Sequence, residues 1–277
     1  MHEEHNSWLA FLYHVQVGGR HLVPEWVPDA VPFAALCAII LAVLSWASTR
    51  RMRVVPRGMQ TVAEFAVGGL TSFTQSIMGE KPGRAFAPFV GTLFIFIMFM
   101  NLFGLIPGMK SATANLNTTA AFALVVFLAT QYYGARTHGV LGYFRHMVAD
   151  VLILPWYLAM LLVPFILVLH LISEFVRPLS LAMRLFGNIM GKEVVLAILA
   201  GLATVTLALF GLHVSGFEVL GNFVRLNVPA IFGPPMLGLT AALIPLAILM
   251  GIIQALVFSL LAALYITLAT ETEAEHA

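Results

Sequence analysis

The sequence contains 277 residues, of which 60% are hydrophobic and only 10% are charged, with a formal net charge of +1. Soluble domains carry about 25% charged residues, so this composition excludes an ordinary soluble protein and predicts a polytopic membrane protein. The balanced charge, without a basic patch interleaved with aromatic residues, gives no indication of a nucleic-acid partner.

Long apolar runs follow one another along the chain. A bilayer core is about 30 Å thick, and a perpendicular helix needs about 20 apolar residues to cross it. We therefore expect an all-α polytopic membrane protein with five to six hydrophobic helices, two of them long and tilted near the C-terminus. All of them are expected to form a single membrane domain over residues 1–277. The uncharged runs are residues 31–49, 85–109, 111–135, 151–169, 194–212 and 226–270.

The first run predicts a transmembrane helix at residues 31–49. The N-terminal sequence MHEEHNSW is acidic and lacks the basic region of a signal peptide, so we expect this run to be retained as a membrane anchor. Cys37, the single cysteine, lies within the run, which excludes an intramolecular disulfide and a cysteine metal cluster.

Residues 56–78 predict an amphipathic helix that lies along the membrane surface. Cations flank this segment, among them Arg57 and Lys81, and are expected to lie near lipid phosphates. A helix in a soluble loop is the alternative interpretation. The apolar positions at helical spacing are Met59, Val62, Phe65, Ala66, Leu70, Phe73 and Ile77.

A transmembrane hairpin is expected next, at residues 86–107 and 117–134. Lysine and arginine residues concentrate between the first two spans and after the third. By the positive-inside rule these loops face the cytoplasm. The N-terminus is then expected on the periplasmic side and the C-terminus in the cytoplasm.

The pattern changes in residues 151–212, where charged residues interrupt otherwise apolar sequence. A single helix of this length would extend about 90 Å at 1.5 Å per residue, so it must bend or lie steeply tilted. Pro155, Pro164 and Pro178 are candidate bends, and a final helix is expected at residues 235–270. The titratable residues of the long helix are His170, Glu174, Arg177, Arg184, Lys192 and Glu193.

Arg184 is the most costly of these residues. An arginine at membrane depth costs about 2.5–3.5 kcal/mol on insertion scales, and a guanidinium does not lose its proton in proteins. Arg184 therefore needs a carboxylate or a water-filled cavity opposite it, and we interpret it as a fixed charge beside an ion path. The alternative is a packing role, in which Arg184 snorkels or pairs with Glu174 or Glu193.

Arg184 shares one helical stripe with other polar residues. Arg177, Ser180, Asn188 and Gly191 lie on this stripe at steps of three and four residues, whereas Glu193 is half a turn out of phase with Arg184. Asn188 either orients the guanidinium or makes an ordinary interhelical hydrogen bond. Glu193 can titrate and so suits a proton path, or it pairs with Lys192 at an interface.

Gln254 lies on one face of the final helix together with Tyr265. Its amide would bond opposite Arg184 if the two long helices are antiparallel neighbours, and otherwise it is a satisfied packing amide. Gly187 and Gly191 form a G-x-x-x-G spacing, which permits close approach of another helix.

The sequence contains no nucleophile triad, no set of metal ligands and no phosphate-binding loop. We therefore expect no catalytic residue, no cofactor and no metal in this chain.

The segment RLFGN at residues 184–188, with Pro178-Leu179-Ser180 before it and Glu193 after it, closely resembles subunit a of the F-type ATP synthase membrane sector. The resemblance extends from about residue 31 to residue 270. Further matching positions are Met100-Asn101-Leu102, Pro107, the segment TANLNTT at 113–119, and Gln254 followed eleven residues later by Tyr265.

The resemblance implies a stator that lies beside a rotating ring of c subunits, each with a membrane-embedded carboxylate. Two aqueous half-channels, one from each side, reach the ring at offset positions, and the arginine separates them. It further implies a non-catalytic subunit without a nucleotide-hydrolysing site, in a bacterial inner membrane. The implied partners are the c-ring, the b-subunit peripheral stalk, the rest of the complex and membrane lipid.

The resemblance also assigns roles to individual residues. Arg184 is implied to be the essential charge, with Asn188 and Gln254 around it and Glu193 in the outward half-channel. Further channel-lining residues would be His170, Glu174, Ser180 and Tyr265.

The sequence departs from the family pattern at two places. Leu246 and Ala247 stand where many relatives carry a histidine or an acid before the glutamine. His170 stands where many carry a carboxylate, so Glu174, one turn later, is expected to take that role. The connection at residues 211–235 is also long for this family.

Two other functions remain as alternatives. A secondary transporter with an intramembrane arginine for an anionic substrate would show inverted repeats and paired broken helices, and we find neither. A purely structural scaffold leaves the cost of Arg184 unexplained.

Overall fold

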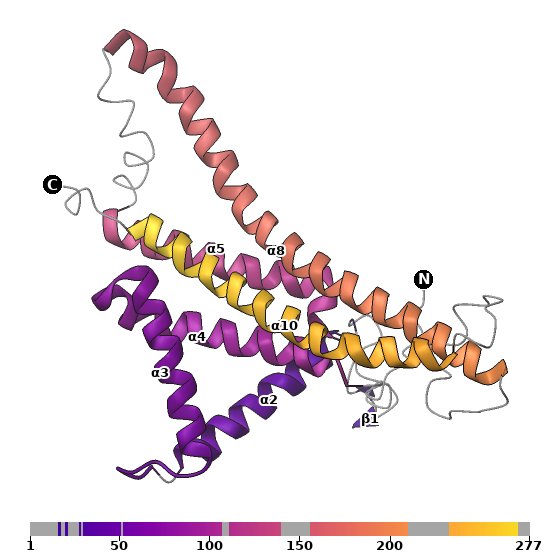
Figure 1. Ribbon diagram of the computed structural model, residues 1–277. Helices are drawn as coiled ribbons and strands as arrows, with labels where there is room; N and C mark the ends of the chain where they lie inside the picture. Colours follow the sequence, from indigo (N-terminus) through magenta and orange to yellow (C-terminus); the bar gives the residue numbers. More distant parts are fainter. Residues whose placement is uncertain are drawn as a thin grey trace. The chain divides into compact units, whose positions relative to one another are not determined.

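The computed structural model describes residues 16–17, 20–21, 28, 30–50, 52–106, 111–139, 156–209 and 233–270 (Figure 1). The described part is built almost wholly from α-helices. Their bounds are α2 Ala30–Thr49, α3 Met59–Met78, α4 Glu80–Phe103, α5 Leu116–His138, α8 Trp156–Leu209 and α10 Gly233–Thr270. The remaining elements are a 3₁₀ turn, η2 Ala112–Ala114, and two antiparallel two-residue strands, β1 Gln16–Val17 and β2 Arg20–His21.

Within the described residues, five helices are long and apolar enough to cross a membrane, which confirms the all-α membrane fold. Their candidate spans are Ala30–Thr49, Glu80–Phe103, Leu116–Thr137, Leu162–Leu199 and Ala242–Thr270. The short strands were not predicted, since four paired residues leave no hydrophobic alternation to detect. Some parts of the predicted spans lie outside the described residues, namely Pro107, residues 151–155 with the predicted bend at Pro155, and residues 210–212. Most of the long connection at residues 211–235 also lies outside them.

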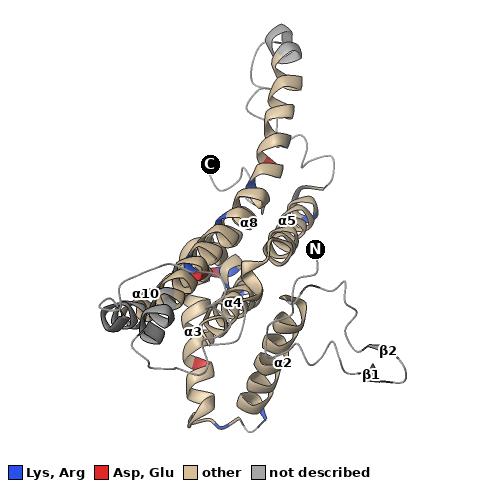
Figure 2. Ribbon diagram, turned by 90° about the vertical axis from the view of Figure 1, so that its right-hand side faces the viewer, with Lys and Arg blue, Asp and Glu red and all other residues tan. Residues whose placement is uncertain are grey.

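Charge distinguishes α8 from its neighbours. Helices α2 and α10 contain no charged residue, whereas blue and red positions lie along α8 in Figure 2. Helix α8 continues through Pro164 and Pro178, each of which removes one backbone donor. Pro234 and Pro235 lie in the first turn of α10, where the missing N–H groups would have no intrahelical acceptor.

The chain forms two compact units. Unit 1 comprises residues 1–46, 95–118 and 186–255, and unit 2 comprises residues 47–94, 119–185 and 256–277. Unit 1 brings the end of α4 and η2 against parts of α8 and α10, through the polar contacts described below. In unit 2, Met78 of α3, Val90 of α4 and Ile266 of α10 form a buried apolar core. Aromatic pairs join α5 to its neighbours in unit 2: Phe86–Tyr133, Phe122–Phe258 and Phe127–Phe175.

The predicted amphipathic segment is helix α3. Val62 and Phe65 on its predicted apolar face are exposed by 71% and 84%, while Phe73 and Ile77, further along the same face, are partly buried. An exposed apolar stripe on a short helix fits a membrane surface better than water.

Helices α3 and α4 form a tight hairpin that depends on two glycines (Figure 1). Gly79 alone separates them, with a φ of 83° that favours glycine. At Gly83 an added Cβ would lie 2.5 Å from the Cα of Gln75. The two backbones are therefore in direct contact at this point.

Substitution of Gly83 by alanine is expected to destabilise the hairpin. The new Cβ would overlap the α3 backbone, and overpacking of this kind costs about 1–3 kcal/mol of unfolding free energy. The measurement is the denaturation midpoint at which a thiol introduced by Met78→Cys, at a buried position of the same hairpin, reacts with a maleimide dye in a Cys37→Ser background. Gly68→Ala is the matched control, because a Cβ at this helical glycine meets nothing within 4 Å. An equal midpoint for both variants would contradict the close contact.

Candidate functional site

Helix α8 has a buried face and an exposed face around the predicted site. Leu181, Leu185 and Ile189 are buried, with exposed fractions of 2%, 0% and 1%. The predicted stripe lies on the other side of the helix. Its members Ser180, Arg184, Asn188 and Gly191 are exposed, and Arg177 is half-buried.

Arg184 is an exposed cation in the middle of an apolar span. Arg184 belongs to unit 2. Among the described residues of that unit, no carboxylate pairs with its guanidinium. Glu174, one of the partners considered for it, accepts a hydrogen bond from the side-chain amide of Gln131. The charge of Arg184 is therefore not balanced within the described part of its unit.

Asn188 and Gln254 join α8 to α10 within unit 1. The Nδ2 of Asn188 donates to the Oε1 of Gln254 over 2.6 Å, and Gln254 is 96% buried (4% exposed). The structure thus brings together two of the predicted site residues. It also shows that the interhelical hydrogen bond considered for Asn188 is formed.

A cavity of about 300 Å³ lies beside this pair, between α8 and α10. Asn188 and Lys192 supply its polar side chains. An added Cβ at Gly187 or Gly191 would meet nothing within 4 Å, so this small-residue face borders open space within the described chain. The remaining lining residues are Gly187, Gly191, Val195, Leu196, Leu243, Leu246, Ala247 and Met250.

Glu193, a predicted site residue, belongs to a polar cluster with Asn101, Ser111 and Thr113. The sequence did not indicate that these residues meet. Its carboxylate accepts a hydrogen bond of 3.2 Å from the backbone N–H of Ser111. The hydroxyls of Ser111 and Thr113 lie 2.7 Å apart, and Thr113 donates to the Oδ1 of Asn101 over 2.6 Å. Lys192 donates to the backbone carbonyl of Asn101 over 3.4 Å. Uncharged polar residues within apolar runs were the signal for this cluster, because such groups must find partners in a membrane.

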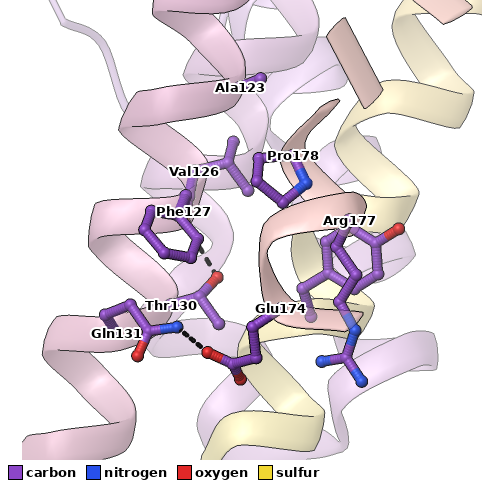
Figure 3. A pocket seen from close by; sticks show the side chains of 9 residues that line it. Ala123, Val126, Phe127, Thr130, Gln131, Glu174, Arg177 and Pro178 are labelled. Atoms are coloured by element: carbon purple, nitrogen blue, oxygen red, sulfur yellow. Dashed lines mark hydrogen bonds between the residues drawn. The ribbon is translucent and has the colours of Figure 1, made fainter. Parts of the chain in front are cut away.

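A second polar cavity lies in unit 2, around Glu174 (Figure 3). Glu174 and Gln131 point toward each other from α8 and α5. Arg177 lies over the ring of Tyr265 of α10, 5.7 Å from the centroid, in the range of a cation–π contact. The cavity holds about 20 Å³, enough for one water molecule, which needs about 10–15 Å³.

The remaining predicted residues are distributed as follows. Tyr265 and Glu174 line the cavity of unit 2, while His170 is exposed on α8. Sequence reasoning missed Gln131, and it treated Arg177 only as a member of the stripe. The described residues contain no group of three or more histidine, cysteine or acidic side chains that could hold a metal ion.

The family model and the curated relatives that match this chain carry the same description. The family model described as "ATP synthase A chain" matches residues 31–267. "ATP synthase subunit a" of Protochlamydia amoebophila is 32% identical, covering 98% of this chain and 86% of the relative. The protein of that name from Geobacter sp. (strain M21) is 39% identical over 86% of both chains. "ATP synthase subunit a 3" of Pelobacter propionicus is 43% identical over 63% of this chain and 72% of its own length.

The hydrogen bond between Asn188 and Gln254 generates a stability prediction. In a double-mutant cycle with Asn188→Leu and Gln254→Leu, we expect a coupling free energy of about 0.6 kcal/mol and at most about 1.7 kcal/mol, the range for interhelical bonds in membranes. The measurement is unfolding of the purified chain in bicelles. Asn117→Leu, an exposed asparagine in α5, is the control partner and should show no coupling to Gln254→Leu. Additive effects of the first pair would contradict the bond.

Proposed function

This chain belongs to the ATP synthase A chain family, and we propose that it is the proton-translocating stator subunit of an F-type ATP synthase. In this role it conducts protons past a rotor ring and has no nucleotide-hydrolysing site of its own. The family membership supports the coarse function, a membrane subunit of ATP synthase, and the geometry of α8 supports the finer assignment.

The observation that carries the finer proposal is the exposed charge of Arg184. A guanidinium within an apolar span is costly without a counter-charge, and the described residues of its unit supply none. A partner that presents a carboxylate at membrane depth would balance it. Each c subunit of the proposed rotor ring has such a carboxylate, and the exposed stripe of α8 is the surface that would face it.

The charge of Arg184 gives the proposed stator its two properties. It favours the ionised form of a passing rotor carboxylate, so that carboxylate releases its proton near Arg184. It also repels protons, which prevents direct leakage between the two half-channels. Moving one charge through 100 mV releases about 2.3 kcal/mol, so several protons per turn supply the energy for ATP formation in the catalytic head.

We assign the outward half-channel to unit 1. Its cavity of about 300 Å³ has room for several water molecules, and Asn188 borders it while bonded to Gln254. Glu193 would be the titratable group of this path. Leu246 and Ala247, at the positions where many relatives carry a histidine or an acid, line the same cavity, so Lys192 is the cationic side chain present there instead.

The inward half-channel is assigned to unit 2, around Glu174. The cavity beside this carboxylate has the volume of one water, and Tyr265 lines it as well. Glu174 would exchange protons with this water, while Ser180 and His170 would line the exposed part of the path along α8. Many relatives carry a carboxylate at the position of His170. In this assignment Glu174 takes the role of that carboxylate.

The proposal includes the surroundings of the subunit. As a multi-pass protein of a bacterial inner membrane, the chain would act as one membrane domain with a periplasmic N-terminus and a cytoplasmic C-terminus. Its partners would be the c-ring, the b-subunit peripheral stalk and the rest of the complex. A secondary transporter would instead work without these partners, so purification of the chain without a ring of small hairpin subunits would favour that alternative.

Replacement of Arg184 by alanine tests the proposed function. We expect ATP synthesis and ATP-driven proton pumping to be abolished in inverted membrane vesicles, because nothing then drives release of the rotor proton. The complex should still assemble, since Arg184 is exposed on α8.

The control for this experiment is Arg136→Ala, which removes an exposed arginine bonded only weakly, at 3.4 Å, to Tyr132. It should retain pumping. Coupled pumping by the Arg184→Ala complex would overturn the assignment.

Glu174→Gln tests the inward half-channel. The amide preserves the shape and the hydrogen bond to Gln131 but cannot ionise, so we expect the pumping rate to fall by about a hundredfold or more, the lower end of the range for loss of an acid–base group. Glu174→Asp should retain part of the rate. Glu64→Gln on α3, an exposed carboxylate, is the control. Full pumping by Glu174→Gln would remove Glu174 from the path.

A further inference from the structure

Asn101 is completely buried at the end of α4, where it contacts both long helices of unit 1. Its Nδ2 donates to the backbone carbonyl of Gly251 in α10 over 3.0 Å. Its own backbone carbonyl accepts from the Nζ of Lys192 in α8 over 3.4 Å. The Oδ1 is occupied by the hydroxyl of Thr113, so the orientation of the amide is determined on both sides.

The approach between α4 and α10 is close and depends on Gly251. An added Cβ at Gly251 would lie 3.2 Å from the Cβ of Asn101, which is tighter than ordinary van der Waals contact. The absence of a side chain there lets the Asn101 amide reach a carbonyl in the middle of a helix. Ser111 packs against Gly104 in the same way, and this brings Thr113 within reach of Asn101.

These contacts lie one helical turn from the Asn188–Gln254 hydrogen bond on both helices. Gly251 precedes Gln254 by three residues and Lys192 follows Asn188 by four, so each contact lies on the same face as the neighbouring member of the pair. We propose that Asn101 is a positioning residue, which holds α8 and α10 at the separation where Asn188 and Gln254 meet. The proposal rests on the proposed function, in which this pair borders the outward half-channel.

The cluster around Asn101 is suited to positioning and not to proton transfer. Thr113 donates its hydroxyl hydrogen to an amide oxygen, which does not pass a proton on. Ser111 reaches Glu193 through its backbone N–H, which does not exchange its proton during turnover. The same contacts that hold Asn101 therefore also hold the carboxylate of Glu193 in place.

The test uses the assembled complex in liposomes, with two variants that disturb the contact in different ways. Asn101→Leu removes the polar contacts at similar volume, and Gly251→Ala leaves Asn101 intact but pushes α10 away from it. The controls are Asn117→Leu, at an exposed asparagine, and Gly68→Ala, at a glycine in open space.

Two quantities are measured for each variant. The first is the distance between nitroxide labels at positions 198 of α8 and 249 of α10, both exposed in unit 1, in a Cys37→Ser background. The second is ATP-driven proton pumping divided by the amount of assembled complex. We expect both variants to shift or broaden the distance and to reduce pumping about tenfold, since displacements near 1 Å have effects of this order or larger. Both controls should match the parent.

The outcomes separate the inference from the proposed function. Label distances equal to those of the parent in both variants would overturn the positioning role of Asn101. A changed distance with reduced pumping supports it. A changed distance with full pumping per complex would support positioning but remove the Asn188–Gln254 pair from the proton path, which contradicts that part of the proposed function.

Discussion

The strongest electrostatic constraint on this chain is the charge of Arg184 within an apolar helix. A guanidinium cannot lose its proton to escape this cost, so it must be balanced by an opposite charge or by water. Helix α8 turns Leu181, Leu185 and Ile189 inward and leaves Arg184 on its exposed side. The described part of its unit contains no carboxylate paired with it. In the proposed function the balance comes from a different protein, and this makes the charge useful, because its counter-ion moves.

The polar residues elsewhere in the helices follow the opposite rule and are satisfied within the chain. Inside a bilayer no water is available to an unpaired polar group. Asn101, Thr113 and Gln254 are accordingly buried and hydrogen-bonded in unit 1. Glu174 is bonded to Gln131 in unit 2. The hydrogen bonds of these groups hold neighbouring helices together, whereas the exposed charge of Arg184 has no such partner in the described part of its unit.

The two cavities have different chemical character, which agrees with different tasks in a proton path. The cavity of unit 1 is large and bordered mainly by apolar side chains and glycines, with Lys192 as its cation. The cavity of unit 2 has the volume of one water and contains a carboxylate, an arginine and a tyrosine. In the proposed function, the first has room for several water molecules beside Asn188 and Lys192, and the second has room for one beside Glu174. Among the described residues, no group of three or more histidine, cysteine or acidic side chains that could hold a metal ion occurs at either cavity.

The sequence by itself determined the membrane class, the apolar spans and the position of Arg184 within an apolar helix, because hydropathy and the cost of an arginine are local properties of a segment. The motif RLFGN also identified the family, which the match over residues 31–267 bears out. Only the tertiary structure decided which polar groups meet. Three hydrogen bonds show this: Asn188 to Gln254, Asn101 of α4 to Gly251 of α10, and Gln131 to Glu174. Each joins residues that are between 43 and 150 positions apart in the sequence, so each depends on how the helices pack. Helical periodicity predicts the face on which a side chain lies but not the partner opposite it, because that partner is set by the relative placement of whole helices.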